Sequence, residues 1–277
     1  MKEVKVGSIR IGNGNPLVLI AGPCVIEGED VVLRIGEKVK KIADKLGIPF
    51  ILKSSYLKDN RSSAESYQGP GVEKGTQILL KAKNELDVPV ISDVHGLEEM
   101  DTAAEVLDII QIPAYLCMQT KLILAAGKTG KALNIKKGQF LHPLDMNNVI
   151  KKLEYSGNRN IMITERGACF GYRSLVADMR SLPLMRDLGY PVVFDPTHSL
   201  RNYGISSADK KGGSPELIPF VARAGVAAGC DVIFIETHDK MEEAKCDAAS
   251  MLPLDKLEDL LISLMEIDKI VKPKLPN

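Results

Sequence analysis

The chain has 277 residues, 45% of them hydrophobic, and its 36 basic residues equal its 36 acidic ones in number. This length fits one barrel or two ordinary domains, and a formal net charge of zero excludes a general attraction to nucleic acid or to an anionic membrane. No apolar run approaches the roughly 18 residues that span a bilayer, and the N-terminus has no signal-peptide core, so we expect a cytoplasmic protein that binds small molecules. The five cysteines are odd in number and widely spaced, which indicates reduced thiols.

The predicted elements alternate between strands and helices. A β-hairpin within residues 1–14 comes first, and amphipathic helical segments such as 31–47 and 76–87 separate the strand-like runs. The runs are rich in Val and Ile and mostly continuous rather than alternating, as in parallel strands buried on both faces. They are LVLIAG (17–22), PFILKSS (49–55), PVISDV (89–94), DIIQIP (108–113), ALNIKK (132–137), NIMITE (160–165), PVVFDP (191–196) and VIFIET (232–237).

Eight such runs predict an α/β fold, a single (β/α)8 TIM barrel over residues 1–277. A doubly wound open sheet is the alternative, although eight units of similar size favour closure. Active sites in this fold lie at the carboxyl ends of the strands. The residues there are unusually polar, which predicts a catalytic rim; they are Cys24, Lys53, Ser54, Asp93, His95, Gln111, Lys136, Glu165, Arg166, Asp195, His198, Glu236 and His238.

Cations are frequent among the residues expected at this rim. They would repel each other without an anionic partner, so together they predict a ligand with several negative groups, Arg suiting bidentate phosphate contact and Lys a point charge. The alternative is that each is a solvated surface residue or half of an ion pair. The cations are Lys53, Lys58, Arg61, Lys136 and Arg166.

A second set of rim residues has the donor types of a metal site. One thiol, one imidazole and two carboxylates suit a borderline divalent ion such as zinc or iron(II), provided that barrel closure brings them together. Alternatively, the cysteine is a buried core residue and the histidine a hydrogen-bonded loop residue. The set is Cys24, His198, Glu236 and Asp247, with His95, His238 and Cys246 as possible substitutes. The polar segment 202–215 that follows is predicted to be either a mobile lid or an ordinary loop.

The sequence resembles the 3-deoxy-D-manno-octulosonate 8-phosphate synthase family from about Leu17 to the last helix. Eight motifs in order carry the resemblance: AGPCVIE (21–27), KSSYLKDNRSS (53–63), IIQIPAYLC (109–117), NIKKGQF (134–140), ITERGACFGY (163–172), DPTHS (195–199), IETH (235–238) and CDAASMLPL (246–254).

The resemblance implies a reaction and a set of roles. Phosphoenolpyruvate C3 would attack the aldehyde of arabinose 5-phosphate, water would add at C2 and phosphate would leave, in lipopolysaccharide inner-core sugar biosynthesis. The family would use Cys24, His198, Asp247, Lys58 and Asp93 in catalysis. Phosphoenolpyruvate would bind Lys53, Lys58, Gln111, Lys136 and Arg166, and arabinose 5-phosphate would bind Asn60, Arg61 and Ser62. Whether Asp247, Glu236 or a metal-bound hydroxide acts as the base stays open.

Two positions imply the metal-requiring class of the family. Cys24 stands where metal-independent members have Asn, and residues 247–250 read DAAS rather than DGPS. We therefore expect one divalent ion (zinc, iron(II), manganese or similar) on Cys24, His198, Glu236 and Asp247. The resemblance also implies a homotetramer. One residue departs from the family, because Met118 stands where many members carry an Arg that reaches the sugar phosphate across a subunit interface.

Two rival functions stay open. A related synthase uses erythrose 4-phosphate to make 3-deoxy-D-arabino-heptulosonate 7-phosphate, but it typically has a KPRTS-like stretch where this chain has KDNRSS, and Asn60 is the residue expected to discriminate. The other rival is a non-catalytic barrel that binds phosphosugars, which would need neither metal nor acid-base groups.

Overall fold

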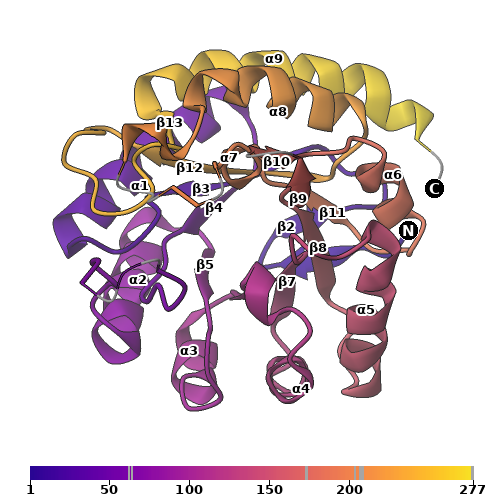
Figure 1. The fold of residues 1–277 in the computed structure, drawn as a ribbon, viewed down its shortest axis with the longest axis horizontal. Helices are drawn as coiled ribbons and strands as arrows, with labels where there is room; N and C mark the ends of the chain where they lie inside the picture. Colours follow the sequence, from indigo (N-terminus) through magenta and orange to yellow (C-terminus); the bar gives the residue numbers. More distant parts are fainter. Residues whose placement is uncertain (62, 64, 172–173, 203, 206–208, 276–277) are drawn as a thin grey trace.

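Strands and helices alternate through the structure (Figure 1), a computed structural model that describes residues 1–61, 63, 65–171, 174–202, 204–205 and 209–275. The principal strands are β3 (Val18–Gly22), β4 (Phe50–Lys53), β5 (Val90–Asp93), β6 (Ile109–Ile112), β7 (Ala132–Lys136), β8 (Ile161–Glu165), β11 (Val192–Phe194) and β12 (Val232–His238). The helices between and after them are α1 (Glu29–Leu46), α2 (Val72–Leu86), α3 (Met100–Val106), α4 (Thr120–Lys128), α5 (Met146–Tyr155), α6 (Ser181–Arg186), α8 (Ile218–Ala227) and α9 (Leu257–Val271).

The eight strands form a closed parallel barrel. Each pairs with the strand next in sequence, and β12 closes the ring by pairing with β3, from Val232 opposite Val18 to Glu236 opposite Gly22. The predicted (β/α)8 barrel is therefore confirmed and the open doubly wound sheet is wrong. Every strand lies within its predicted run except β12, which extends one residue further, to His238.

The expected N-terminal hairpin is present and closes one end of the barrel. Strand β1 (Val4–Val6) pairs antiparallel with β2 (Ile9–Ile11). Val4, Val6 and Ile11 are buried in one cluster with inward barrel residues such as Val18. The hairpin therefore covers the amino ends of the strands and leaves the carboxyl ends open.

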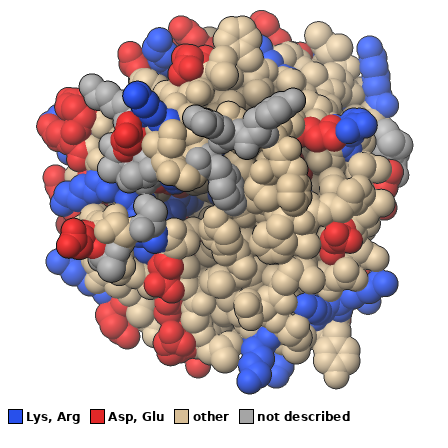
Figure 2. Space-filling view, in the orientation of Figure 1, with Lys and Arg blue, Asp and Glu red and all other residues tan. Residues whose placement is uncertain are grey.

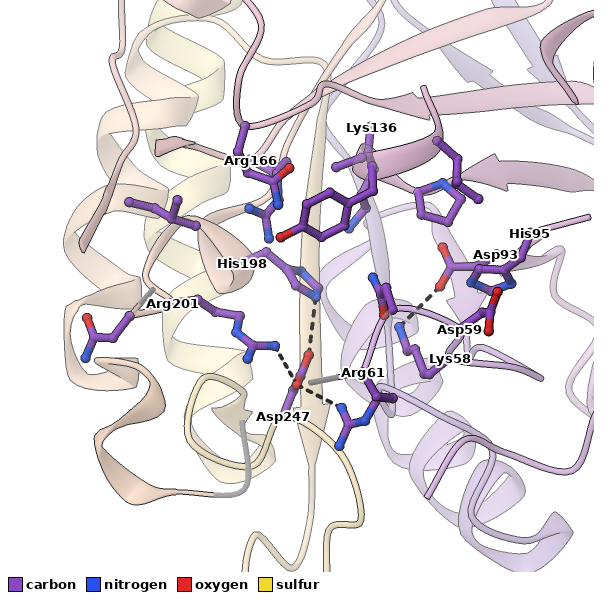
Figure 3. Close-up of a pocket in the computed structure, with 18 of the residues that line it drawn as sticks. Lys58, Asp59, Arg61, Asp93, His95, Lys136, Arg166, His198, Arg201 and Asp247 are labelled. Atoms are coloured by element: carbon purple, nitrogen blue, oxygen red, sulfur yellow. Dashed lines mark hydrogen bonds and ion pairs between the residues drawn. The ribbon is translucent and has the colours of Figure 1, made fainter. Parts of the chain in front are cut away.

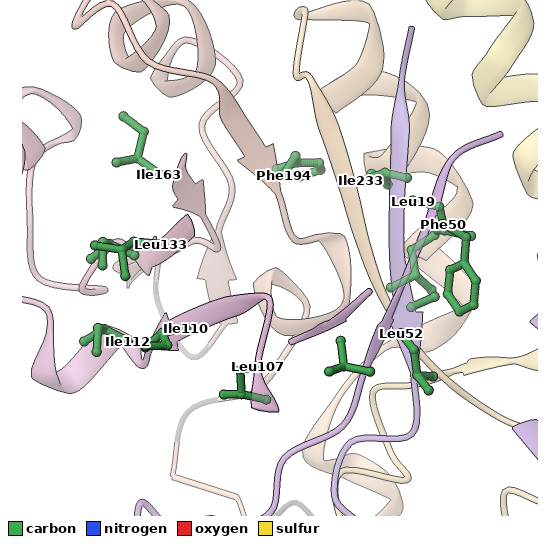
Figure 4. Packing of buried hydrophobic residues seen from close by; sticks show 14 of the residues in the cluster. Leu19, Phe50, Leu52, Leu107, Ile110, Ile112, Leu133, Ile163, Phe194 and Ile233 are labelled. Atoms are coloured by element: carbon green, nitrogen blue, oxygen red, sulfur yellow. The ribbon is translucent and has the colours of Figure 1, made fainter. Parts of the chain in front are cut away.

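Alternate residues of each strand face opposite sides of the barrel wall. Phe50 and Leu52 on β4 pack outward with the helices, as do Leu19, Leu133 and Ile233 on other strands (Figure 4). The inward positions on β4 are Ile51 and then Lys53, and other strands repeat this step from apolar to polar. The barrel interior is thus hydrophobic toward the amino ends of the strands and polar at their carboxyl ends.

Helix α1 shows how the covering elements begin and end. Glu29 and Asp30 occupy its first turn, where negative charge interacts favourably with the helix dipole. It ends at Gly47, whose φ of 68° is left-handed and easily adopted only by glycine. Among the described residues, no helix combines the length and the apolar character needed to cross a bilayer.

Short elements cover the open end of the barrel. They are the hairpin of β9 (Ala168–Gly171) and β10 (Ser174–Val176), the single turn α7 (Pro196–Ser199) and β13 (Leu252–Pro253). The segment predicted as a lid or loop, 202–215, lies partly outside the described residues, but its ends are joined by a bridge between Arg201 and Gly213. Acidic and basic side chains are interspersed around the edge of the face in Figure 2, with no single extended basic surface on that face.

Candidate active site

A cavity of about 530 Å³ opens at the carboxyl end of the barrel. Figure 3 shows cationic side chains from several strand ends pointing into it. The predicted site residues that line it are Lys58, Asn60, Arg61, Asp93, His95, Lys136, Arg166, His198 and Asp247. Four others, Cys24, Lys53, Gln111 and Glu236, are buried and are not part of the described lining. Ser62 lies outside the described residues.

Three buried lysines of the site each have a carboxylate partner. Lys53 forms a short ion pair with Glu236, Lys58 Nζ lies 3.2 Å from Asp93 Oδ2, and Lys136 Nζ lies 2.5 Å from Asp195 Oδ2. Burial opposes the charge on Lys58, but Cys24, Asp93 and Glu236 hold its pKa well above the usual value. Burial lowers the pKa of Lys136 despite the neighbouring carboxylates. Four of the five predicted cations therefore line one cavity, while Lys53 is buried in an ion pair, as the alternative interpretation describes.

A chain of hydrogen bonds fixes the polar layer across four neighbouring strands. Gln111 donates from Nε2 to Asp93 Oδ1 (2.5 Å) and accepts at Oε1 from Asn134 Nδ2 (2.8 Å). Thr164 Oγ1 then donates to Asn134 Oδ1 (2.6 Å). Since both ends of its amide are occupied, Gln111 holds Asp93 in position in this structure, whereas a contact with phosphoenolpyruvate remains a prediction.

Asp195 determines how His198 presents its ring. Asp195 is the N-cap of α7: its Oδ1 accepts from the backbone N of His198 (2.9 Å), and its Oδ2 lies 2.7 Å from His198 Nδ1. The pKa of Asp195 is held far below the usual range because His198 and Lys136 outweigh its burial. A protonated Nδ1 leaves the Nε2 lone pair directed at Glu236 (3.5 Å) and Asp247 (3.7 Å). A carboxylate behind the imidazole is the usual support of a metal-binding histidine.

The predicted metal ligands fall into two overlapping groups of donor atoms that share Asp247. One group is Cys24, Cys246 and Asp247, the other is His198, Glu236 and Asp247, and all of these residues are buried. The sulfur atoms of Cys24 and Cys246 are 2.9 Å apart. Asp247 has a φ of 50°, a left-handed conformation that is uncommon outside glycine and frequent at functional sites.

The electrostatics of these donors fit a divalent cation. Burial raises the pKa of Cys24 well above that of a free thiol, so its thiolate needs a nearby positive charge. Burial also raises the pKa of Glu236, but the charges of Lys53 and His198 outweigh burial and lower this pKa to about 2. Glu236 Oε2 is buried and accepts no hydrogen bond from the described residues. An ionised oxygen left in this way is costly unless a cation satisfies it.

Two proposed substitute ligands do not join these groups. His95 lines the cavity, but the acid that its Nδ1 approaches is Glu99, whose Oε2 lies 3.9 Å away. His238 is buried, with Nδ1 accepting from the backbone N of Lys240 (2.9 Å). The third substitute, Cys246, does lie among the donors.

Three residues of the site were given no role by the sequence analysis. Phe234 lies inside the barrel with Lys136 Nζ 3.8 Å and Lys53 Nζ 5.6 Å from its ring centroid. Arg201 lines the cavity, and Asp195 orients His198. The sequence analysis did place Asp195 at a strand end, and the position of Arg201 shortly after that strand end was a possible signal for it. Nothing in the run VIFIET distinguishes Phe234 from a core residue.

Comparison with known proteins assigns the whole chain to one group. The profile described as the DAHP synthetase I family matches residues 2–273. The chain is 51% identical to a protein of Geobacter sp. (strain M21) over 270 residues, 98% of each chain. It is 52% identical to a protein of Citrifermentans bemidjiense over 98% of each chain, and 52% identical to one of Geotalea uraniireducens over 98% of this chain and 100% of the other. All three relatives bear the name 2-dehydro-3-deoxyphosphooctonate aldolase.

Proposed function

The chain belongs to the DAHP synthetase I family and, within it, to the 2-dehydro-3-deoxyphosphooctonate aldolases, and on this premise we propose how its site performs the reaction. It is an enzyme that condenses phosphoenolpyruvate with arabinose 5-phosphate and water, forming the eight-carbon keto acid phosphate and inorganic phosphate. The alternative that uses erythrose 4-phosphate is not favoured, because relatives at about half identity over the whole chain carry the octonate name. The same names argue against a non-catalytic barrel.

The observation that carries the mechanism is the cation-lined cavity above a layer of paired lysines and carboxylates. Lys136 and Arg166 lie together on one side of His198 (Figure 3) and would hold the carboxylate and phosphate of phosphoenolpyruvate. Lys58 lines the same cavity and Lys53 is buried nearby, and Asp93 and Glu236 balance their charges. Fixed charges of this kind stabilise the charge that develops as C3 attacks the aldehyde and phosphate leaves C2.

We further propose that Cys24, His198, Glu236 and Asp247 hold one divalent ion. Three observations support this set: Glu236 Oε2 accepts no hydrogen bond within the described part of the chain, Asp195 orients His198, and the buried donors converge. When bound, such an ion supplies a Lewis acid for a substrate oxygen. The protein positions the ligands. Asp195 fixes the imidazole of His198. Gly22 at the end of β3 lets that strand approach β4 closely, since a Cβ there would lie 2.1 Å from Lys53 O.

The substrate assignment is tested by measuring phosphate release from phosphoenolpyruvate with each aldehyde in turn. We expect rapid release with arabinose 5-phosphate and little with erythrose 4-phosphate. A preference for the four-carbon sugar would reverse the assignment, and release with neither would reject condensation as the activity.

The metal is tested by removing it with chelator and confirming its removal by elemental analysis. We expect turnover to disappear and to return when a divalent ion is added, while circular dichroism stays unchanged because the barrel core contains none of the four ligands. Full activity in the metal-free protein would refute the proposal.

Asn60 and Arg61 are proposed to act on the sugar, with Ser62 beside them. Both described residues line the cavity, on the segment that follows β4. Replacing Asn60 with Ala should raise the Michaelis constant for arabinose 5-phosphate by about tenfold, the effect of one lost hydrogen bond in a closed site, and should change that for phosphoenolpyruvate much less. An equal rise for the two substrates would contradict the assignment.

Finally, we propose a cytoplasmic homotetramer, on family membership. Several apolar side chains are exposed near the barrel mouth, including Tyr115 and Phe140, each about half exposed. Light scattering should give about four times the chain mass of 30.2 kDa. A mass equal to one chain would refute the assembly.

A further inference from the structure

A buried ion pair beside the cavity has no part in the mechanism described above. Lys137 directly follows β7, Glu165 is the last residue of β8, and each is 1% exposed. Counted along their strands, the two residues fall on the same side as Ile135 and Ile163, which pack outward under the helices. Because burying two charges in an apolar layer costs free energy, the pair is a poor source of stability for that layer.

The ammonium group of Lys137 holds the turn that follows β7. Its Nζ donates to Gly138 O (3.4 Å) and to Leu141 O (3.2 Å), and it lies 3.6 Å from Glu165 Oε2. These three oxygens match the three donors of an ammonium group. The two carbonyl groups come before and after Gln139, which lines the cavity. Lys137 therefore fixes the turn that carries this lining residue.

The carboxylate of Glu165 holds the loop that follows β8. Its Oε1 accepts from the backbone N of Gly167 (2.6 Å), so the side chain spans the backbone of Arg166. Its Oε2 is buried and accepts no hydrogen bond within the part of the chain that the structure describes, and the charge of Lys137 balances it. Glu165 therefore fixes the backbone from which Arg166 enters the cavity.

A backbone hydrogen bond joins the two loops, so that the contacts form a closed ring. Cys169 N, in the loop after β8, donates to Gln139 O, in the turn after β7 (3.0 Å). The ring runs from Lys137 through this turn to the second loop and returns through Glu165. Because the backbone on both sides of Arg166 is held, its guanidinium group loses less conformational freedom when it binds an anion.

We propose that Lys137 and Glu165 are positioning residues, which touch no substrate and hold Arg166 where it binds phosphoenolpyruvate. The inference rests on the proposed function, because it names the residues that keep one part of that site in place. Lys136, the other cation assigned to this substrate, lies beside Arg166 in Figure 3 and has its own partner, Asp195. Loosening the ring should therefore weaken phosphoenolpyruvate binding through Arg166 and leave arabinose 5-phosphate binding nearly unchanged.

The proposal is tested by calorimetric titration of the full-length protein with each substrate. Lys137→Met keeps a long side chain without its charge and donors, and should raise the dissociation constant for phosphoenolpyruvate about tenfold. Glu165→Gln keeps an oxygen for Gly167 N but loses the ion pair, and should cause a smaller rise. The dissociation constant for arabinose 5-phosphate should change by less than about threefold in both variants.

Two further measurements test whether the effect passes through the ring. In Arg166→Gln the positioned guanidinium group is already absent, so adding Lys137→Met should raise the dissociation constant for phosphoenolpyruvate by less than about threefold more. A further rise of about tenfold would contradict a route through Arg166. In Lys137→Met, backbone amides within 138–142 and 166–171 should exchange hydrogen faster than in the wild type.

Lys272→Met is the matched control. Lys272 is also buried, donates to Cys230 O (3.1 Å) and lies 3.1 Å from Asp268 Oδ1, but these contacts are near the amino end of β12. Both lysine variants should unfold at a lower urea concentration than the wild type. Only Lys137→Met should weaken phosphoenolpyruvate binding and speed exchange in the two loops.

The positioning role is wrong if Lys137→Met binds phosphoenolpyruvate as tightly as the wild type. It is also wrong if Lys272→Met loses the same affinity, as expected from a general loss of stability. The proposed function fails separately: wild-type protein that binds phosphoenolpyruvate but releases no phosphate with either aldehyde rejects condensation, while the dissociation constants still decide the role of Lys137. Wild-type protein that does not bind phosphoenolpyruvate would reject both.

Discussion

Replacing Phe234 with Leu tests whether the aromatic ring inside the barrel supports the cations above it. Lys136 Nζ lies 3.8 Å from the ring centroid and is almost fully buried, so the attraction between ammonium and ring acts with little screening and contributes about 1–2 kcal/mol. If Lys136 binds phosphoenolpyruvate as proposed, the Michaelis constant for that substrate should rise about 5- to 20-fold.

The same substitution should change the pH profile. Burial already lowers the pKa of Lys136, and the ring favours its protonated form. Loss of the ring should lower that pKa further, so the alkaline limb of kcat/KM should move to lower pH.

Phe194→Leu is the matched control for this experiment. Phe194 is equally buried on the neighbouring strand, but it faces outward, against Gly225. Each substitution removes similar buried area and should cost about 1 kcal/mol of folding stability by urea unfolding. Only Phe234→Leu should alter phosphoenolpyruvate binding and the alkaline limb. If the two variants have the same kinetics, the ring is only a core residue and the argument is refuted.

Two further predictions concern parts of the chain away from the cavity. Arg186 Nη1 donates to both carboxylate oxygens of the fully buried Asp231 (2.9 and 2.8 Å), just before β12. Because Arg186→Met leaves this carboxylate without its arginine, it should lower the free energy of unfolding by about 3–5 kcal/mol. A loss below about 1 kcal/mol in urea unfolding would contradict this. Burial raises the pKa of the Cys230 thiol to about 12, so at pH 8 iodoacetamide should modify half-buried Cys169 long before Cys230; peptide mapping that finds Cys230 modified first would contradict the burial argument.

The positions of the barrel strands could be read from the sequence. Continuous Val and Ile runs such as LVLIAG and NIMITE are buried on both sides, by the barrel interior and by the helices, so each run marks its strand closely. Because the runs are apolar throughout, the sequence did not show which residues face the barrel interior and which face the helices. Ile51 and Leu52 are both apolar, yet one fills the barrel and the other packs under the helices.

The sequence by itself determined which chemical groups stand at the strand ends, because a parallel barrel brings every strand's carboxyl end to the same rim. Lysines, carboxylates, Cys24 and His198 were therefore identified as site residues before their distances were known. Only the tertiary structure decided the pairs among them. Cys24 meets Cys246, and Arg201 meets Asp247, across 222 and 46 residues of chain. Such contacts depend on how β12 closes against β3 and on how the loops above the barrel turn, and no local pattern of residues encodes that geometry.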